Sequence, residues 1–227
     1  MISRYVAVLG LLASGACGRS DNSPPARPPA STAHPAAEAA LPTVVFLGTS
    51  LTAGLGLDPE QAYPALVQAK IDSAGLHYRV VNAGVSGETS AGALRRIDWL
   101  LRDHPAVLVI ETGANDGLRA QDPDSTRANI QAIIDRVRAL SPPPRIVLVG
   151  MEALPNYGPL YARLFRAIYP DLARRNHIPL VPFLLTGVAG VDSLNQADGM
   201  HPTAAGQRVV AEMVWQTLGP VLRGSAR

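Results

Sequence analysis

A serine, an aspartate and a histidine stand in segments suited to nucleophilic catalysis. Ser50 lies in the segment 48–54, which contains two glycines and two threonines and directly follows an apolar run. Asp198 and His201 stand three residues apart, a spacing of about one helical turn that lets both side chains reach one cleft. Because a serine hydroxyl needs a base, we expect His201 to take the proton of Ser50 and Asp198 to orient the imidazole ring.

The four other histidines are less suited to this role. His34 lies in a proline- and alanine-rich stretch, and His77, His104 and His177 each stand just before an apolar run with the character of a β-strand. In a parallel sheet, residues that precede the strands lie at the edge opposite the carboxyl ends, where ligands bind. His201 instead follows the last of these runs and a long loop, so it is the candidate base.

Each candidate residue also has a structural interpretation. Ser50 taken alone would more often be a helix N-cap, and Asp198 with His201 could be a turn aspartate and a helix-start histidine. Ser86, in a second glycine-containing segment, is a rival nucleophile. Glycines leave backbone N–H groups approachable, so Ser50 can present both its hydroxyl and its N–H to a ligand. The three residues together favour the catalytic interpretation.

Five short apolar runs are expected to form buried strands of a parallel sheet. They cover residues 43–47, 78–81, 106–110, 146–149 and 179–181. Short, fully apolar runs are typical of strands that are covered on both faces. Glycine-containing segments with small polar side chains follow the first three runs, at 48–54, 82–90 and 111–117. Because ligands bind outside the carboxyl ends of parallel strands, we expect these segments to form the site.

Segments with helical spacing alternate with the apolar runs. They cover residues 94–101, 130–140, 164–172 and 209–218. We expect Asp124 or Ser125 to cap the second helix, and His201 with Pro202 to open the last one. The alternation predicts a single α/β domain: a three-layer α/β/α sandwich with a flavodoxin-like, doubly wound sheet of about five parallel strands.

Four blocks stand in an order typical of one enzyme family. They are Gly48-Thr49-Ser50-Leu51, Val85-Ser86-Gly87-Glu88-Thr89-Ser90, Gly113-Ala114-Asn115-Asp116 and Asp198-Gly199-Met200-His201-Pro202. These blocks are similar to the G-D-S-L block, the glycine block, the G-x-N-D block and the D-G-x-H-P block of the SGNH (GDSL-like) hydrolases. The resemblance covers nearly all of residues 42–222 and is closest to the small bacterial thioesterases, lysophospholipases and arylesterases.

The resemblance implies a role for each block. It makes Ser50 the nucleophile, and Asp198 and His201 its acid and base. The oxyanion hole would consist of the Ser50 N–H, the Gly87 N–H and the Asn115 side chain. No metal and no cofactor is implied.

The segment after the fourth strand resembles the mobile loop that lines the acyl pocket in this branch. It contains Leu154, Pro155, Asn156 and Tyr157. An ordinary Pro/Gly connection is an equally good interpretation of these four residues.

Thr49 departs from the family pattern, in which the G-D-S-L block has aspartate at this position. That aspartate supports the loop and is not the acid of the triad, so the replacement affects local hydrogen bonding and removes no catalytic group. In the same pattern Ser86 is a loop residue. The G-x-S-x-G signature is absent around Ser50, so the nucleophile elbow of the α/β-hydrolases is not the template.

The first residues have the order of a secretory signal. Arg4 precedes the apolar run 5–13, and the small residues 14–16 follow it. We therefore expect residues 1–17 to be a signal peptide and the protein to be exported, as a periplasmic, membrane-anchored or secreted protein.

Cys17 is the only cysteine of the chain and directly follows the small residues. There it resembles the lipidated cysteine of bacterial lipoproteins, and ordinary cleavage nearby is the alternative. Residues 18–41, rich in proline and alanine, are expected to be a disordered tether before an SGNH hydrolase domain at 42–227. Membrane contact is expected only through this N-terminal anchor.

Charge and composition exclude several partners. Residues 1–41 hold three of the 20 basic and two of the 18 acidic residues, so 17 basic and 16 acidic residues remain in the expected domain. No basic cluster is interleaved with aromatic residues, as a nucleic-acid surface would require. No later apolar stretch is long enough to span a bilayer. We expect a monomer that does not bind nucleic acid.

The sequence thus predicts an exported serine esterase that hydrolyses carboxylic esters or thioesters through an acyl-enzyme. The expected substrates are aryl esters, short-to-medium acyl esters or lysophospholipids. A carbohydrate O-deacetylase with the same fold ranks second, because only 5% of the residues are aromatic and sugar stacking would be weak. A non-catalytic binding module is the third interpretation.

Overall fold

The computed structural model describes residues 41–224 of the chain. The expected signal peptide at 1–17, Cys17 and all but the last residue of the expected tether lie outside the described residues and remain predictions. Within residues 41–224, no helix is both long and apolar enough to cross a membrane.

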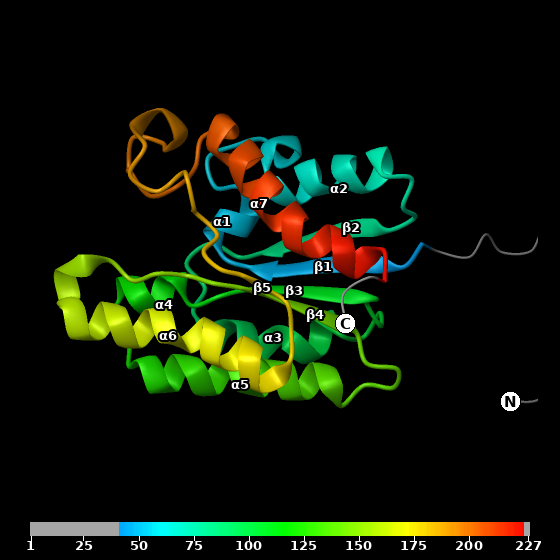
Figure 1. The fold of residues 1–227 in the computed structure, drawn as a ribbon, viewed down its shortest axis with the longest axis horizontal. Coiled ribbons are helices and arrows are strands. Elements are labelled where there is room, and N and C mark those ends of the chain that lie inside the picture. The colour runs from blue at the N-terminus through cyan, green and yellow to red at the C-terminus, as the bar shows by residue number, and fades with distance from the viewer. Residues whose placement is uncertain (1–40, 225–227) are drawn as a thin grey trace, which may run out of the picture. The chain divides into compact units, whose positions relative to one another are not determined.

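A parallel sheet forms the middle layer of the fold (Figure 1). Its strands are β1 (Thr43–Gly48), β2 (Arg79–Gly84), β3 (Val107–Glu111), β4 (Arg145–Val149) and β5 (Leu180–Val181). They lie in the order β2-β1-β3-β4-β5, and every neighbouring pair is parallel. The expected α/β fold with five parallel strands is confirmed.

The strand order determines where a ligand can bind. The chain runs outward from β1 to β2 and then returns to the other side of β1 with β3. In such flavodoxin-like sheets the binding crevice lies at this reversal, outside the carboxyl ends of the strands. Residues that follow β1 and β3 therefore meet at one crevice.

Helices cover both faces of the sheet (Figure 1). On one face lie α1 (Ser50–Ala53), α2 (Tyr63–Ser73) and α7 (Ala204–Leu222). On the other face lie α3 (Ser90–Leu100), α4 (Ala114–Leu118), α5 (Pro123–Arg138) and α6 (Pro159–Asn176). Helix α2 packs against α7, while α5 packs against both α3 and α6. Single 3-10 turns stand at Pro59–Gln61, Pro155–Tyr157 and Asp192–Leu194.

The inner strands carry most of the core. Every residue of β3, and every residue after the first in β1 and β4, is buried. In β2 no residue is fully buried, so the expectation of a buried second strand is wrong. As an edge strand, β2 has a neighbour on one side only.

The start of α5 differs from the expectation. Asp122 is the N-cap, and its carboxylate accepts hydrogen bonds from the N–H groups of Asp124 and Ser125. The predicted cap at Asp124 or Ser125 is therefore wrong by two or three residues. Proline at the first helical position explains the earlier start, because its fixed φ suits a helix and its missing N–H needs no partner there.

Two further helices differ from the expectation. Helix α7 begins at Ala204 after the N-cap Thr203, whose hydroxyl accepts the Gly206 N–H, so His201 and Pro202 precede the helix rather than open it. Helix α2 had no expected counterpart, because its apolar residues are only weakly segregated to one face.

Candidate active site

Ser50 is the first residue of α1 and stands two residues after the end of β1. Only 9% of the residue is exposed. The helix N-cap is Thr49, whose hydroxyl accepts the Leu51 N–H. The structural interpretation of Ser50 as a cap is therefore wrong, and its hydroxyl is available for another contact.

Two glycines make the turn after β1 compact. A Cβ atom on Gly48 would stand 2.0 Å from the Thr52 Oγ1, and one on Gly84 would stand 2.3 Å from the Ala53 N. Because real Cβ atoms do not approach this closely, both positions require glycine. The glycine at the end of β2 thus lets α1 lie directly against that strand.

Thr49 ties the turn to the neighbouring strand. Its N–H donates to the Glu111 carboxylate at 2.8 Å, and its hydroxyl donates to the same group at 3.0 Å. The Thr52 hydroxyl adds a third hydrogen bond at 2.8 Å. Burial raises the pKa of Glu111, and these hydrogen bonds oppose the rise. With Thr49 at the position of the family's aspartate, the turn thus keeps side-chain hydrogen bonds to the neighbouring strand.

His201 joins Ser50 to Asp198. The His201 Nε2 lies 2.9 Å from the Ser50 Oγ, and its Nδ1 lies 2.6 Å from the Asp198 Oδ2. A neutral imidazole has one donor and one acceptor nitrogen. With the proton on Nδ1 donated to Asp198, Nε2 accepts the hydroxyl proton of Ser50, as a general base must.

The segment that holds Asp198 and His201 is a loop, not a helical turn. The Asp198 Oδ1 accepts hydrogen bonds from the N–H groups of Met200 and His201, at 2.9 and 3.0 Å. The two side chains meet at 2.6 Å although the segment between them is not helical. Hydrogen bonds hold the pKa of Asp198 well below its ordinary value. The largest contribution comes from the His201 N–H, followed by the imidazole and the Met200 N–H. The aspartate is therefore an anion that stabilises the imidazole.

Two glutamines fasten this loop to the rest of the site. Gln196 donates to the carbonyl oxygens of Leu55 and Pro202, at 2.7 and 3.0 Å. Gln207, in α7, donates to the Leu51 carbonyl at 3.3 Å and accepts the Tyr63 N–H at 2.9 Å. The segment of Ser50 and the segment of His201 are therefore joined by side chains that do not take part in the triad.

Backbone and amide donors face the same cleft. Within the described residues, neither the Ser50 N–H nor the Gly87 N–H donates to another group. Gly87 has a φ of +77°, a conformation that favours glycine. The Asn115 Nδ2 donates to the Glu88 carbonyl at 3.0 Å, which leaves one of its two hydrogens for another acceptor. Ser50, Gly87 and Asn115 all line one cavity.

A buried carboxylate, Asp116, holds together the two loops that carry Gly87 and Asn115. It accepts the Ser90 N–H at 2.8 Å and the Ser90 hydroxyl at 2.5 Å. The Thr126 hydroxyl also donates to it at 3.2 Å. The buried hydrogen bonds of Asp116 therefore fix the relative position of the segments that carry Gly87 and Asn115.

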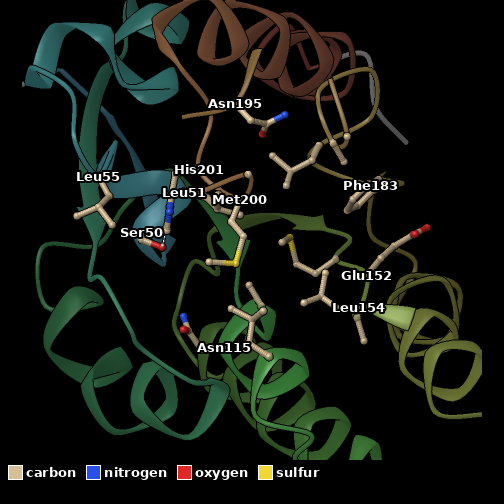
Figure 2. Close-up of a pocket in the computed structure, with 18 of the residues that line it drawn as sticks. Ser50, Leu51, Leu55, Asn115, Glu152, Leu154, Phe183, Asn195, Met200 and His201 are labelled. Atoms are coloured by element: carbon tan, nitrogen blue, oxygen red, sulfur yellow. Dashed lines mark hydrogen bonds between the residues drawn. The ribbon is translucent and has the colours of Figure 1, made fainter. Parts of the chain in front are cut away.

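The cavity has a volume of about 660 Å³ and a mainly apolar wall. Ser50 and His201 stand on one side of it, with Asn115 below them and Phe183, Leu154 and Glu152 on the far side (Figure 2). Met151, Leu118, Leu185 and Met200 contribute further apolar surface. Such a cavity accommodates a hydrocarbon group next to the serine.

The loop after β4 contributes to this cavity in part. Leu154 and Pro155 line it, whereas Asn156 and Tyr157 do not. The Tyr157 hydroxyl instead donates to the Leu118 carbonyl at 2.8 Å and ties the loop to α4.

The remaining candidates lie where the sequence indicated. His77, His104 and His177 are exposed, and His177 is the C-cap of α6. Ser86 lines the cavity, but within the described residues its hydroxyl makes no hydrogen bond to a histidine. Ser50 is the serine that contacts the imidazole.

Sequence reasoning gave no role to Glu111, which lies in the expected site segment 111–117, and it missed Gln207. Glu111 was placed in the loop after the third run, but it is the last residue of β3. An acidic residue at the end of an otherwise apolar strand was a usable signal, since a carboxylate there is buried at the crevice. Gln207 carried no signal, because its partners are distant in the sequence.

Known proteins resemble this chain over most of its length. Residues 46–209 match the model of the GDSL-like Lipase/Acylhydrolase family. The chain is 44% identical over 186 residues to the esterase TesA of Pseudomonas aeruginosa, with 82% of this chain and 92% of that protein covered. It is 37% identical to thioesterase 1/protease 1/lysophospholipase L1 of Escherichia coli K12, with 81% and 86% covered.

A solved structure extends the likeness to three dimensions. The psychrotrophic esterase EstA from Pseudoalteromonas sp., inhibited by monoethylphosphonate, is 32% identical and has a TM-score of 0.75. The alignment covers 80% of this chain and 98% of that one.

Proposed function

Because this chain belongs to the GDSL-like lipase/acylhydrolase family and is a carboxylic ester hydrolase, we propose that it acts as an exported serine esterase with a Ser50, His201 and Asp198 triad. The main support is the continuous hydrogen-bond chain from Ser50 through His201 to Asp198 at the wall of an apolar cavity.

In the first step, the Ser50 Oγ attacks the carbonyl carbon of the ester while its proton passes to the His201 Nε2. The carbonyl oxygen becomes an oxyanion that accepts hydrogen bonds from the Ser50 N–H, the Gly87 N–H and the Asn115 Nδ2. Collapse of this intermediate breaks the bond to the leaving group, which takes the proton from His201. The products are an alcohol or thiol and an acylated Ser50.

In the second step, water replaces the leaving group. His201 takes a proton from the water as its oxygen attacks the acyl carbon, and the same donors stabilise the second oxyanion. Ser50 leaves with the proton from His201, and the carboxylic acid is released. Asp198 stays ionised throughout and stabilises the imidazolium.

The cavity wall favours acyl esters over sugar esters. Leu118, Met151, Leu154 and Phe183 line it, and such surface binds a hydrocarbon chain by burial of apolar area. The relatives are named esterase and thioesterase/lysophospholipase, which fits aryl esters, short-to-medium acyl esters, thioesters and lysophospholipids. Residues 1–17 support export, which makes extracytoplasmic esters the natural substrates.

The proposed location is the periplasm or a membrane surface, with a monomeric domain held there by a lipid on Cys17. The tether at 18–41 supports this arrangement by its composition. Incorporation of a labelled fatty acid into the full chain tests it, with Cys17→Ser as the comparison. Equal labelling of both proteins, or labelling of neither, would contradict the anchor and leave the esterase untouched.

The central experiment is hydrolysis of a series of p-nitrophenyl esters, from acetate to palmitate, by the protein and by Ser50→Ala. We expect Ser50→Ala to abolish the activity. Ser86→Ala is the matched control, because Ser86 also lines the cavity but does not contact His201, and it should retain activity. An alkyl phosphonate activated as its p-nitrophenyl ester should label the protein on Ser50, because the Ser50 Oγ displaces p-nitrophenolate from phosphorus. Full activity of Ser50→Ala would overturn the proposal.

A further inference from the structure

Glu111 is a buried carboxylate that the proposed mechanism does not use. It is the last residue of β3 and is fully buried. It does not line the cavity, so it has no access to a substrate. Its hydrogen-bond partners belong to the segment that carries the nucleophile and not to the acid–base loop.

The partners of Glu111 flank Ser50 on both sides. Thr49, one residue before the serine, donates twice, and Thr52, two residues after it, donates once. The Tyr63 hydroxyl lies 2.7 Å from the Thr52 Oγ1. Because the single hydroxyl hydrogen of Thr52 goes to Glu111, Tyr63 donates to Thr52. Three donors therefore point toward the buried carboxylate, and Tyr63 holds Thr52, the residue of the third donor, in place.

These bonds also determine where the Ser50 N–H points. The Thr49 carbonyl accepts the Ala53 N–H at 2.9 Å. The peptide between Thr49 and Ser50 is planar, so the Ser50 N–H points opposite to that carbonyl, out of the N-terminal end of α1. A fixed Thr49 therefore fixes the direction of the amide hydrogen and the starting point of the serine side chain.

We propose that Glu111 is a positioning residue that, through Thr49 and Thr52, holds both the hydroxyl and the N–H of Ser50 in the geometry for attack. The inference rests on the proposed role of Ser50. Thr49 contributes to the same positioning: in this chain a hydroxyl donor stands where the family pattern has a carboxylate, and it donates directly to the Glu111 carboxyl group.

The test compares Thr49→Val, Thr49→Ser and Glu111→Gln with the unmodified protein. Thr49→Val keeps the shape and the N–H but loses the hydroxyl, whereas Thr49→Ser keeps the hydroxyl. Small displacements of a reacting group cost up to about 100-fold in rate. We expect Thr49→Val and Glu111→Gln to lower kcat about 10- to 100-fold with KM nearly unchanged, and Thr49→Ser to restore most of kcat.

A purely structural role predicts a different pattern. Asn176→Ala is the control: Asn176 is a buried polar residue at the far end of α6, bonded to Gln131 and Arg138. It should lower the Tm and leave kcat unchanged. If Thr49→Val and Glu111→Gln behave like Asn176→Ala, with a lower Tm and an unchanged kcat, the inference is overturned.

Reaction with the p-nitrophenyl ester of an alkyl phosphonate separates this inference from the proposed function. The rate of Ser50 labelling should fall in Thr49→Val and Glu111→Gln in parallel with kcat. Absence of labelling in the unmodified protein would instead contradict the role of Ser50 itself. Normal labelling and normal kcat in both variants would contradict only the role of Glu111.

Discussion

The nucleophile turn (residues 48–53) and the acid–base loop (residues 196–202) meet at one hydrogen bond but are held in different ways. The turn is buried, bonded to Glu111 and confined by two positions that exclude a side chain. The loop is more exposed. The side chain of Asp198 is 41% exposed, and the hydrogen bonds of Asp198 are to residues of the same loop. A substitution in the turn should therefore change both the position of Ser50 and the stability of the fold. A substitution in the loop should change the position of the catalytic groups and leave the fold stable.

The largest effect is expected from the loop. His201→Ala should lower kcat by roughly 10⁴-fold or more, and Asp198→Asn by roughly 10³- to 10⁴-fold, because the nucleophile loses its base or the base loses its orientation. The Tm should change little in both variants. Steady-state kinetics and thermal unfolding measure the two quantities, with the exposed His77→Ala as an unaffected control. A large drop in Tm would show that the loop is coupled to the core after all.

The second-largest loss of activity is expected from Asn115, on α4 directly after β3. Asn115→Ala should lower kcat about 100- to 1,000-fold with a small change in KM, as the loss of one oxyanion donor typically does. The measurement is kinetics with a p-nitrophenyl ester, with Asn176→Ala as the control. Full turnover of Asn115→Ala would exclude this amide as a donor.

Gly48→Ala should affect stability and activity together. Its Cβ would stand 2.0 Å from the Thr52 Oγ1 and 2.8 Å from the Glu111 Oε2, so the turn must shift. Overpacking of this kind costs about 1–3 kcal/mol of unfolding free energy, and the displaced Ser50 should lower kcat as well. Denaturant unfolding and kcat of the folded protein are measured on one preparation. A fall in the unfolding free energy with unchanged kcat, or the reverse, would show that stability and catalytic geometry are not coupled in the turn.

Gln207→Leu should weaken the joint between the two regions. It removes the acceptor of the buried Tyr63 N–H and a donor to the Leu51 carbonyl, at a cost of about 1–3 kcal/mol. We expect a modest fall in kcat in addition, because α7 follows the His201 loop directly. Gln131→Leu, on α5 at the opposite face of the sheet, should leave kcat unchanged. If both variants have the same kcat, Gln207 does not connect the nucleophile turn to the acid–base loop.

The smallest effect is a dependence of stability on pH. The hydrogen bonds that Asp198 accepts hold its pKa below the ordinary value of 3.8. A lowered pKa in the folded state stabilises the fold above the unfolded pKa, and this contribution disappears as the pH falls through the folded pKa. The Tm difference between the protein and Asp198→Asn should therefore be constant near neutral pH and shrink below about pH 4. Because Asp198 is exposed, the difference should be small. A difference that grows toward low pH would contradict the assignment.

Much of the fold could be predicted because its signals are local. The five apolar runs correspond to five strands, since buried parallel strands need continuous apolar residues. Two differences from the expectation have a nonlocal cause: β2 is partly exposed because it lies at the edge of the sheet, and the unpredicted α2 is held by its packing against α7 rather than by a clear apolar face. The α5 cap was wrong by a few residues because several polar residues in succession can fill that position.

The sequence by itself determined which groups are available and in which order: a serine after β1, an amide after β3, and an acid and base near the C-terminus. Only the tertiary structure decided that Ser50 and His201, 151 residues apart, stand 2.9 Å from each other. It also decided that Glu111 supports the nucleophile and that Gln207 joins the two regions. The physical reason is that hydrogen bonds depend on distances of a few tenths of an ångström, and these are set by the packing of strands and helices that lie far apart in the chain.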